Sequence, residues 1–384
     1  MKMHDLITVT RDKDGKVAMV HLRKPSCFHN HLRLGALRDA VSPASTWPYK
    51  YVLVMPNTKP HLLTVEDALR YKREVEALLR QHDINTIIIP TIYLTAGTTP
   101  EMIDAIADLS GDVPIGVKGY PPGGTTNSDE AADLRTMGAV LKRMEARDVR
   151  LLIHGECVLD KYNNTIPFPD REAYFMEHVF PRVRDEHPDL LICLEHVTTA
   201  KAVGLVKQDP TLDTVCTITP QHMMLTAQAF EEPWGGVHAR CMPYLKSEAE
   251  RFAVADFATS GDPRAILGTD NAPHLFKKMK DKPFEEAACG CYTPHALGMY
   301  AEVFEQFGRL DERFAHFASL NGPRWWGLPE PKDYEQVVLS DGFMPAIPEP
   351  TKVPAEHDIV VPLGWTSDPR ERMPLSLATH MTNG

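Results

Sequence analysis

The sequence has no long hydrophobic run and no apolar leader. Nowhere in its 384 residues does an apolar stretch approach the roughly 18 residues that a helix needs to cross a bilayer. The first 25 residues are polar and charged, without the apolar core of a signal peptide. These absences argue against a membrane protein and against secretion.

The sequence also lacks an excess of basic charge and a regular set of cysteines. Acidic residues outnumber basic ones, 52 against 41, for a formal net charge of −11, so we expect no nucleic-acid partner. The seven cysteines are odd in number and scattered, which is typical of a reducing compartment and not of a disulfide framework. With 43% hydrophobic and 24% charged residues, the composition is that of a globular protein. We therefore expect a cytoplasmic α/β enzyme.

Short apolar runs alternate with helical segments between about residues 26 and 330. Several runs are nearly continuous in Ile, Leu and Val, as in strands buried on both faces of a parallel sheet. The predicted strands are Cys27–Leu32, Tyr51–Met55, Thr86–Ile92, Ile115–Tyr120, Arg150–His154, Leu190–His196, Thr214–Thr219 and Ala265–Asp270. Helices are expected after Thr64 and Thr99, and over about 128–147, 170–186, 199–208, 247–259 and 295–307.

Eight such alternations in one chain predict a (β/α)₈ TIM barrel over residues 26–330. An open doubly wound sheet is the less favoured alternative, because no Gly-x-Gly-x-x-Gly turn follows the first strand. Alternating residues around Asp14-Gly15 predict a short N-terminal β-hairpin within residues 1–25, packed on the barrel. Residues 331–384 are rich in proline and are expected to form an extended C-terminal tail wrapping the barrel.

Polar residues occupy or end five of the predicted strands. They are His29 and His31, Lys118, His154, His196 and Asp270. Because barrel active sites lie at the carboxyl ends of the strands, these side chains are expected to converge. Imidazole and carboxylate suit Zn²⁺, and an incomplete protein shell leaves room for water. A lysine buried beside metal ions must lose its proton, and its neutral amine can take up carbon dioxide to form a bridging carbamate.

The order of these residues matches the ligand order of the amidohydrolase superfamily, and the chain resembles a bacterial class II dihydroorotase. The resemblance runs in one order from residue 25 to about 330. Its motifs are His29-Asn30-His31-Leu32-Arg33, Val54-Met55-Pro56-Asn57, Lys118-Gly119-Tyr120-Pro121, Thr125-Thr126-Asn127-Ser128, Leu152-Ile153-His154-Gly155-Glu156, Glu195-His196-Val197-Thr198-Thr199, Ile218-Thr219-Pro220-Gln221-His222, Gly268-Thr269-Asp270-Asn271-Ala272-Pro273-His274 and Asn321-Gly322-Pro323.

The resemblance implies two Zn²⁺ per chain, bridged by carbamylated Lys118 and a hydroxide. One zinc would be held by His29, His31 and Asp270, and the other by His154 and His196. Asp270 would also accept the proton of the hydroxide and deliver it to the departing amide nitrogen. The implied enzyme interconverts dihydroorotate and N-carbamoyl-L-aspartate in pyrimidine biosynthesis, as a homodimer.

The resemblance also implies a set of substrate contacts. Arg33, Asn57 and His274 stand where the family holds the substrate carboxylate, and Met242 where a backbone group contacts the pyrimidine ring. Thr125 and Thr126 lie in the family's mobile lid, residues 121–128 here. Tyr292 stands where the family has a small substrate-contacting residue.

Other interpretations stay open at this point. Cys27, Leu34 and Tyr292 depart from the family pattern, which leaves room for another cyclic amide of the hydantoin or dihydropyrimidine type. A non-catalytic barrel serving as a binding module is a third hypothesis, although such a protein would be expected to lose ligands, and all six are present. His222 follows the seventh strand and is either a site residue or a core residue.

Overall fold

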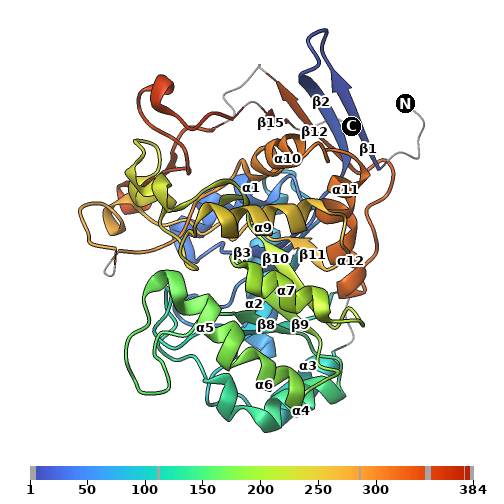
Figure 1. Ribbon diagram of the computed structural model, residues 1–384, viewed down its shortest axis with the longest axis vertical. Coiled ribbons are helices and arrows are strands. Elements are labelled where there is room, and N and C mark those ends of the chain that lie inside the picture. Colours follow the sequence, from blue (N-terminus) through green and yellow to red (C-terminus); the bar gives the residue numbers. More distant parts are fainter. Residues whose placement is uncertain (1–5, 110–112, 285–286, 342–346, 376, 381–384) are drawn as a thin grey trace.

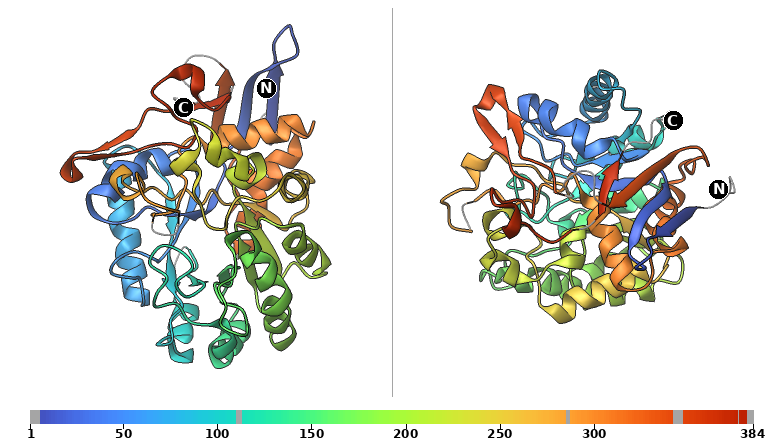
Figure 2. Two further views of the ribbon diagram at one scale, coloured as in Figure 1. Left: turned by 60° about the vertical axis from the view of Figure 1, so that its left-hand side comes forward. Right: turned by 90° about the horizontal axis from the view of Figure 1, so that it is seen from above.

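The computed structural model describes residues 6–109, 113–284, 287–341, 347–375 and 377–380. Its centre is a barrel of short parallel strands with helices on the outside (Figures 1 and 2). The barrel strands are β3 (Cys27–Asn30), β4 (Tyr51–Val54), β5 (Ile87–Ile89), β6 (Thr91–Tyr93), β7 (Gly116–Gly119), β8 (Leu151–His154), β9 (Ile192–Glu195), β10 (Thr214–Ile218) and β11 (Ala265–Leu267).

The ring of strands consists of two hydrogen-bonded sheets, and a single bridge links the first strand to the segment after the last. Pairing runs β3-β4-β5 and then β6-β7-β8-β9-β10-β11. The predicted strand Thr86–Ile92 is thus two short strands, because Pro90 between them has no N–H to give to a ladder. A parallel bridge between Asn30 and Asn271 joins the first strand to the segment after the last. The eight predicted strand positions therefore close into a (β/α)₈ barrel.

The helices follow the strands along the chain. They are α1 (Gly35–Thr46), α2 (Val65–Arg80), α3 (Pro100–Ala107), α4 (Gly138–Ala146), α5 (Arg171–His178), α6 (Phe180–Glu186), α7 (Ala200–Gln208), α8 (Pro220–Met224), α9 (Glu248–Thr259), α10 (Ala296–Gln306), α11 (Glu312–Ala315) and α12 (Asn321–Trp326). Thr64 begins α2 with a full capping box, and Thr99 caps α3 ahead of Pro100. Of the described helices, none is both long and apolar enough to cross a membrane.

Two predicted helices were wrong in extent. Residues 128–147 do not form one helix: α4 starts only at Gly138, and Ser128 bonds back to Thr125 instead of capping a helix. Residues 170–186 split into α5 and α6 around Val179. Pro181, near the start of α6, has no N–H to donate to the carbonyl four residues earlier, which ends the first helix.

The two ends of the chain meet in one antiparallel sheet. β1 (Ile7–Arg11) and β2 (Val17–Arg23) form the expected hairpin, and β2 also pairs with β12 (Gln336–Asp341), which pairs with β15 (Leu377–His380). Figure 1 shows this sheet at one end of the molecule. The C-terminal segment also forms the small hairpin β13 (Thr351–Val353) and β14 (Asp358–Val360), so it contains more regular structure than an extended tail.

The barrel interior is filled below the polar strand ends. Phe28, Leu53, Ile89, Leu152 and Ile266 belong to one buried cluster and come from different strands around the ring. Packed layers of this kind make the barrel a core and not a pore. The polar side chains at the strand ends therefore lie next to a closely packed layer of buried apolar side chains.

Candidate active site

The predicted metal ligands lie together in the structure. Asp270 Oδ1 is 3.3 Å from His29 Nε2 and 3.1 Å from His31 Nε2. The ring of His196 has its centroid 4.9 Å from that of His29 and 4.4 Å from that of His154. All of these side chains are buried. Strands from opposite ends of the barrel sequence thus deliver four imidazoles and one carboxylate to one small volume.

Three of the polar residues after the strands have unusual backbone conformations. Arg33, His196 and Asp270 have φ angles of 66°, 41° and 44°, in the left-handed region that non-glycine residues rarely adopt. Such conformations cost free energy and persist where the surrounding structure demands them, commonly at functional sites. The backbone N–H of His196 is held by Thr217 Oγ1 at 2.8 Å.

Two buried glutamates orient the histidines, and neither was predicted. Glu195 accepts a short contact from His29 Nδ1, and Thr217 Oγ1 donates to the same carboxylate at 2.8 Å. Glu156 Oε2 lies 2.6 Å from His154 Nε2. A carboxylate on one ring nitrogen fixes the tautomer and leaves the other nitrogen for a metal. Their position in the sequence could have identified them, since each glutamate lies within two residues of a predicted metal ligand.

The residues fit a bound metal ion, since ligand atoms of His29, His196 and Asp270 all lie within 4.8 Å of one another. Within the described part of the chain, Lys118 Nζ and His196 Nδ1 are buried and have no hydrogen-bond partner. Burial lowers the pKa of Lys118, because a charged amine without a partner is costly in the barrel interior. Burial acts to raise the pKa of Asp270, yet the adjacent His29 and His31 hold it well below its usual value. Imidazole nitrogens, an ionised carboxylate and a lysine amine form a donor set suited to Zn²⁺.

Arg33 and His274 lie side by side near this cluster. Arg33 Nη2 is 3.0 Å from His274 Nε2, and Arg33 Nε donates to the carbonyl of Pro273 at 3.0 Å. Tyr71 donates to the Arg33 carbonyl at 2.7 Å, which holds the strained backbone. Burial lowers the pKa of Arg33 to about 10, so the guanidinium stays charged at neutral pH. Burial and Arg33 lower the pKa of His274 well below its usual value, so this imidazole is neutral.

Asn57 and Met242, two further predicted substrate residues, are both buried. Asn57 is buried and donates to the carbonyl of Thr126 at 2.8 Å, which joins it to the lid segment containing Thr125. Met242 is buried in the loop before α9. His222 supports that loop, since its ring nitrogens lie 2.6 Å from Thr219 Oγ1 and 2.9 Å from the carbonyl of Pro243. His222 is therefore a packing residue that anchors the segment carrying Met242.

Tyr292 contacts the C-terminal segment of the chain. Its hydroxyl lies 2.9 Å from Thr351 Oγ1 on β13. Its ring packs in a buried apolar cluster with Val41, Leu275, Val353 and Val360. The large side chain at this position attaches the C-terminal segment, and its contact with substrate stays a prediction.

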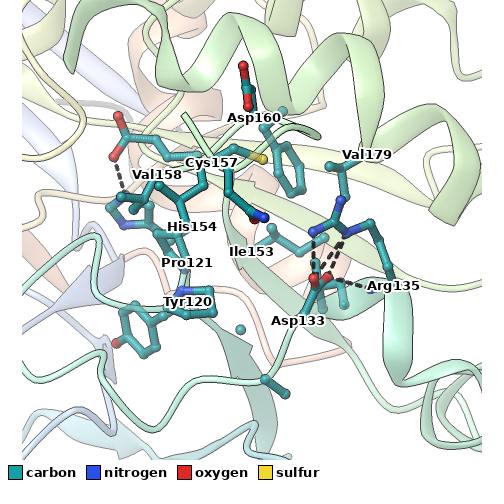
Figure 3. Close-up of a pocket in the computed structure, with 18 residues that line it drawn as sticks. Tyr120, Pro121, Asp133, Arg135, Ile153, His154, Cys157, Val158, Asp160 and Val179 are labelled. Atoms are coloured by element: carbon teal, nitrogen blue, oxygen red, sulfur yellow. Dashed lines mark hydrogen bonds and ion pairs between the residues drawn. The ribbon is translucent and has the colours of Figure 1, made fainter. Parts of the chain in front are cut away.

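A cavity of about 200 Å³ lies behind His154. Figure 3 shows Tyr120, Pro121 and His154 on one side and the Asp133–Arg135 ion pair on another. Arg33 and Asp270 are not among the residues that line it. The cavity therefore borders the predicted ligand His154 but not the Arg33–His274 pair.

Comparison with known proteins decides the family. No family model matches the sequence. A dihydroorotase of Halorhodospira halophila is 40% identical over 348 residues, which are 89% of this chain and 95% of that protein. A mitochondrial dihydroorotase of Oryza sativa is also 40% identical, over 324 residues, 83% of this chain and 76% of that protein. The chain belongs to the dihydroorotase family. The predicted membership is confirmed.

Solved structures confirm the fold of this dihydroorotase-family chain. The dihydroorotase of Saccharomyces cerevisiae in complex with 5-fluoroorotic acid matches with a TM-score of 0.80 and 24% identity, over 95% of this chain and 99% of that one. An L-hydantoinase of Arthrobacter aurescens matches with a TM-score of 0.69 and 17% identity, over 96% and 88%. The dihydroorotase barrel and the hydantoinase barrel are thus the same fold, and the site must decide between their substrates.

Proposed function

We propose that the protein interconverts dihydroorotate and N-carbamoyl-L-aspartate at a binuclear metal centre. The observation that carries the proposal is the meeting of two groups of residues: a buried cluster of nitrogen and carboxylate ligands, and beside it a half-buried arginine next to a neutral histidine. The first group suits hydrolysis of an amide, and the second suits a substrate that carries a carboxylate.

His29, His31 and Asp270 would hold one zinc, and His154 and His196 the other, with carbamylated Lys118 between them. Two bound zinc ions polarise a carbonyl oxygen and activate water as a nucleophile near neutral pH. Glu195 and Glu156 would keep the second nitrogens of His29 and His154 free for the metals. Burial lowers the pKa of Lys118 and so favours its neutral amine, the form that reacts with carbon dioxide.

Asp270 is placed to move the proton. Its depressed pKa keeps it ionised, so it can accept a proton from the attacking water and pass it to the departing ring nitrogen. Ring closure of carbamoyl aspartate would use the same residue in reverse. Met242 and the lid residues Thr125 and Thr126 would complete the enclosure of the ring.

Arg33 favours dihydroorotate over a neutral cyclic amide. A guanidinium presents two parallel donors that match a carboxylate, and His274 and Asn57 would complete this clamp. Dihydrouracil and unsubstituted hydantoin have no carboxylate, so they would leave the half-buried charge of Arg33 unpaired. The cytoplasmic location and the homodimer stay predictions from the sequence.

The binuclear centre can be tested directly by metal removal. Protein purified without chelators should contain about two zinc-like ions per chain and lose activity on dialysis against a chelator. Zinc added back should restore turnover of dihydroorotate. Fewer than one ion per chain in fully active protein would contradict the proposal.

A further inference from the structure

The lid segment 121–128 is joined to the loop after β4 by two reciprocal hydrogen bonds. Asn57 Nδ2 donates to the carbonyl of Thr126 at 2.8 Å, and Asn127 Nδ2 donates to the carbonyl of Asn57 at 2.8 Å. Each asparagine side chain therefore binds the backbone of the other loop. The two loops lie about 70 residues apart in the sequence, and these two hydrogen bonds hold them together.

The lid segment is itself a compact turn. Ser128 is fully buried; its hydroxyl donates to the carbonyl of Thr125 at 2.8 Å and accepts from the Thr125 N–H at 3.0 Å. The Gly123 N–H donates to the carbonyl of Ser128 at 3.1 Å. Tyr93 donates to the carbonyl of Asn127 at 3.3 Å. Internal bonds thus shape the lid, and Asn127 attaches it to its surroundings through both its side chain and its carbonyl.

We propose that Asn127 is a positioning residue that couples the seating of the lid to recognition of the substrate carboxylate. A primary amide has two N–H donors. In Asn57 one of them is held by the lid carbonyl of Thr126, which fixes the amide plane and directs the second donor to the substrate. The inference rests on the proposed function, because it takes Asn57 as part of the carboxylate clamp.

This arrangement makes lid closure and carboxylate binding one event. When Asn127 releases Asn57, the lid carbonyl withdraws and the Asn57 amide can rotate. The clamp then loses an ordered donor although Arg33 and His274 are untouched. The carboxylate does not react, so the loss falls on substrate binding more than on the chemical step.

Asn127→Gly and Asn127→Asp test this inference. Asn127 has a φ of 55°, which glycine adopts without strain, so the glycine variant removes the amide while preserving the turn. Aspartate keeps the size of the side chain but, when ionised, cannot donate. Asn163→Gly is the matched control, since Asn163 also has a positive φ, 65°, and lies in an exposed surface loop.

Both Asn127 variants should raise KM for dihydroorotate about five- to tenfold, the effect of one lost hydrogen bond, with kcat changed less than about threefold. Hydrogen exchange at residues 123–128 should quicken, and Asn163→Gly should change neither quantity. In an Asn57→Ala background, Asn127→Gly should add less than about twofold to KM. Unchanged KM in both Asn127 variants, or a full multiplicative effect in the Asn57→Ala background, would overturn the coupling.

The same assays separate this inference from the proposed function. Arg33→Met, measured in parallel, reports on the carboxylate clamp alone. A large loss with Arg33→Met and none with the Asn127 variants would refute the coupling and leave the proposed function standing. No loss with Arg33→Met would refute the clamp itself, whatever the Asn127 variants do.

Discussion

Replacing Arg33 by methionine should weaken turnover of dihydroorotate strongly and selectively. The methionine side chain is similar in length to that of arginine, and the backbone strain at φ 66° is the same for both residues. The change therefore measures the effect of the guanidinium alone. A hydrogen bond to a charged group contributes about 1.5–3 kcal/mol. Since 1.4 kcal/mol is tenfold, kcat/KM for dihydroorotate should fall about tenfold to 150-fold.

Steady-state assays of ring opening should be run on wild type, Arg33→Met and Arg33→Lys. The lysine variant keeps the charge but not the two parallel donors, so its loss should be intermediate. An uncharged substrate such as dihydrouracil, if turned over at all, should be affected less than about threefold. Arg33→Met with kcat/KM for dihydroorotate within threefold of wild type would refute the clamp.

Three further substitutions test other parts of the site. Lys118→Ala should abolish turnover and lower bound metal by about one ion per chain, with partial rescue by short carboxylic acids; near-normal turnover would refute the bridge. Glu195→Gln should weaken metal binding about 10- to 100-fold in chelator competition, because His29 loses its charged partner; unchanged affinity would show that Glu195 does not tune the ligand. Tyr292→Phe should leave KM for dihydroorotate within about twofold, because its hydroxyl bonds Thr351; a tenfold rise would show that the Tyr292 hydroxyl binds the substrate.

The strands and the ligand cluster were predictable because they depend on local patterns. Buried parallel strands are short apolar runs, and the residue that ends such a run points toward the barrel mouth. This places His154, His196 and Asp270 without any knowledge of long-range contacts. The family resemblance then supplied the predicted substrate residues Arg33, Asn57 and His274, which no periodicity reveals.

What escaped prediction depends on contacts between distant segments. Glu195 meets His29 from across the barrel, and nothing in the local sequence of either residue specifies that pair. Ser128 precedes acidic residues as an N-cap would, yet its hydroxyl closes the lid turn instead. β12 pairs with β2, which lies more than 300 residues earlier in the sequence. The strand in the proline-rich tail was therefore not predicted. The contact of Tyr292 with Thr351, which lies in that same tail, could not be predicted either.

The most direct test of the account compares substrates on the metal-loaded wild-type enzyme. Dihydroorotate, unsubstituted hydantoin and dihydrouracil should be assayed under identical conditions, with ring closure of carbamoyl aspartate measured alongside. The account predicts a kcat/KM for dihydroorotate at least about tenfold above that of either neutral ring, matching the Arg33 contribution, together with measurable ring closure. Equal or better turnover of hydantoin or dihydrouracil would contradict it.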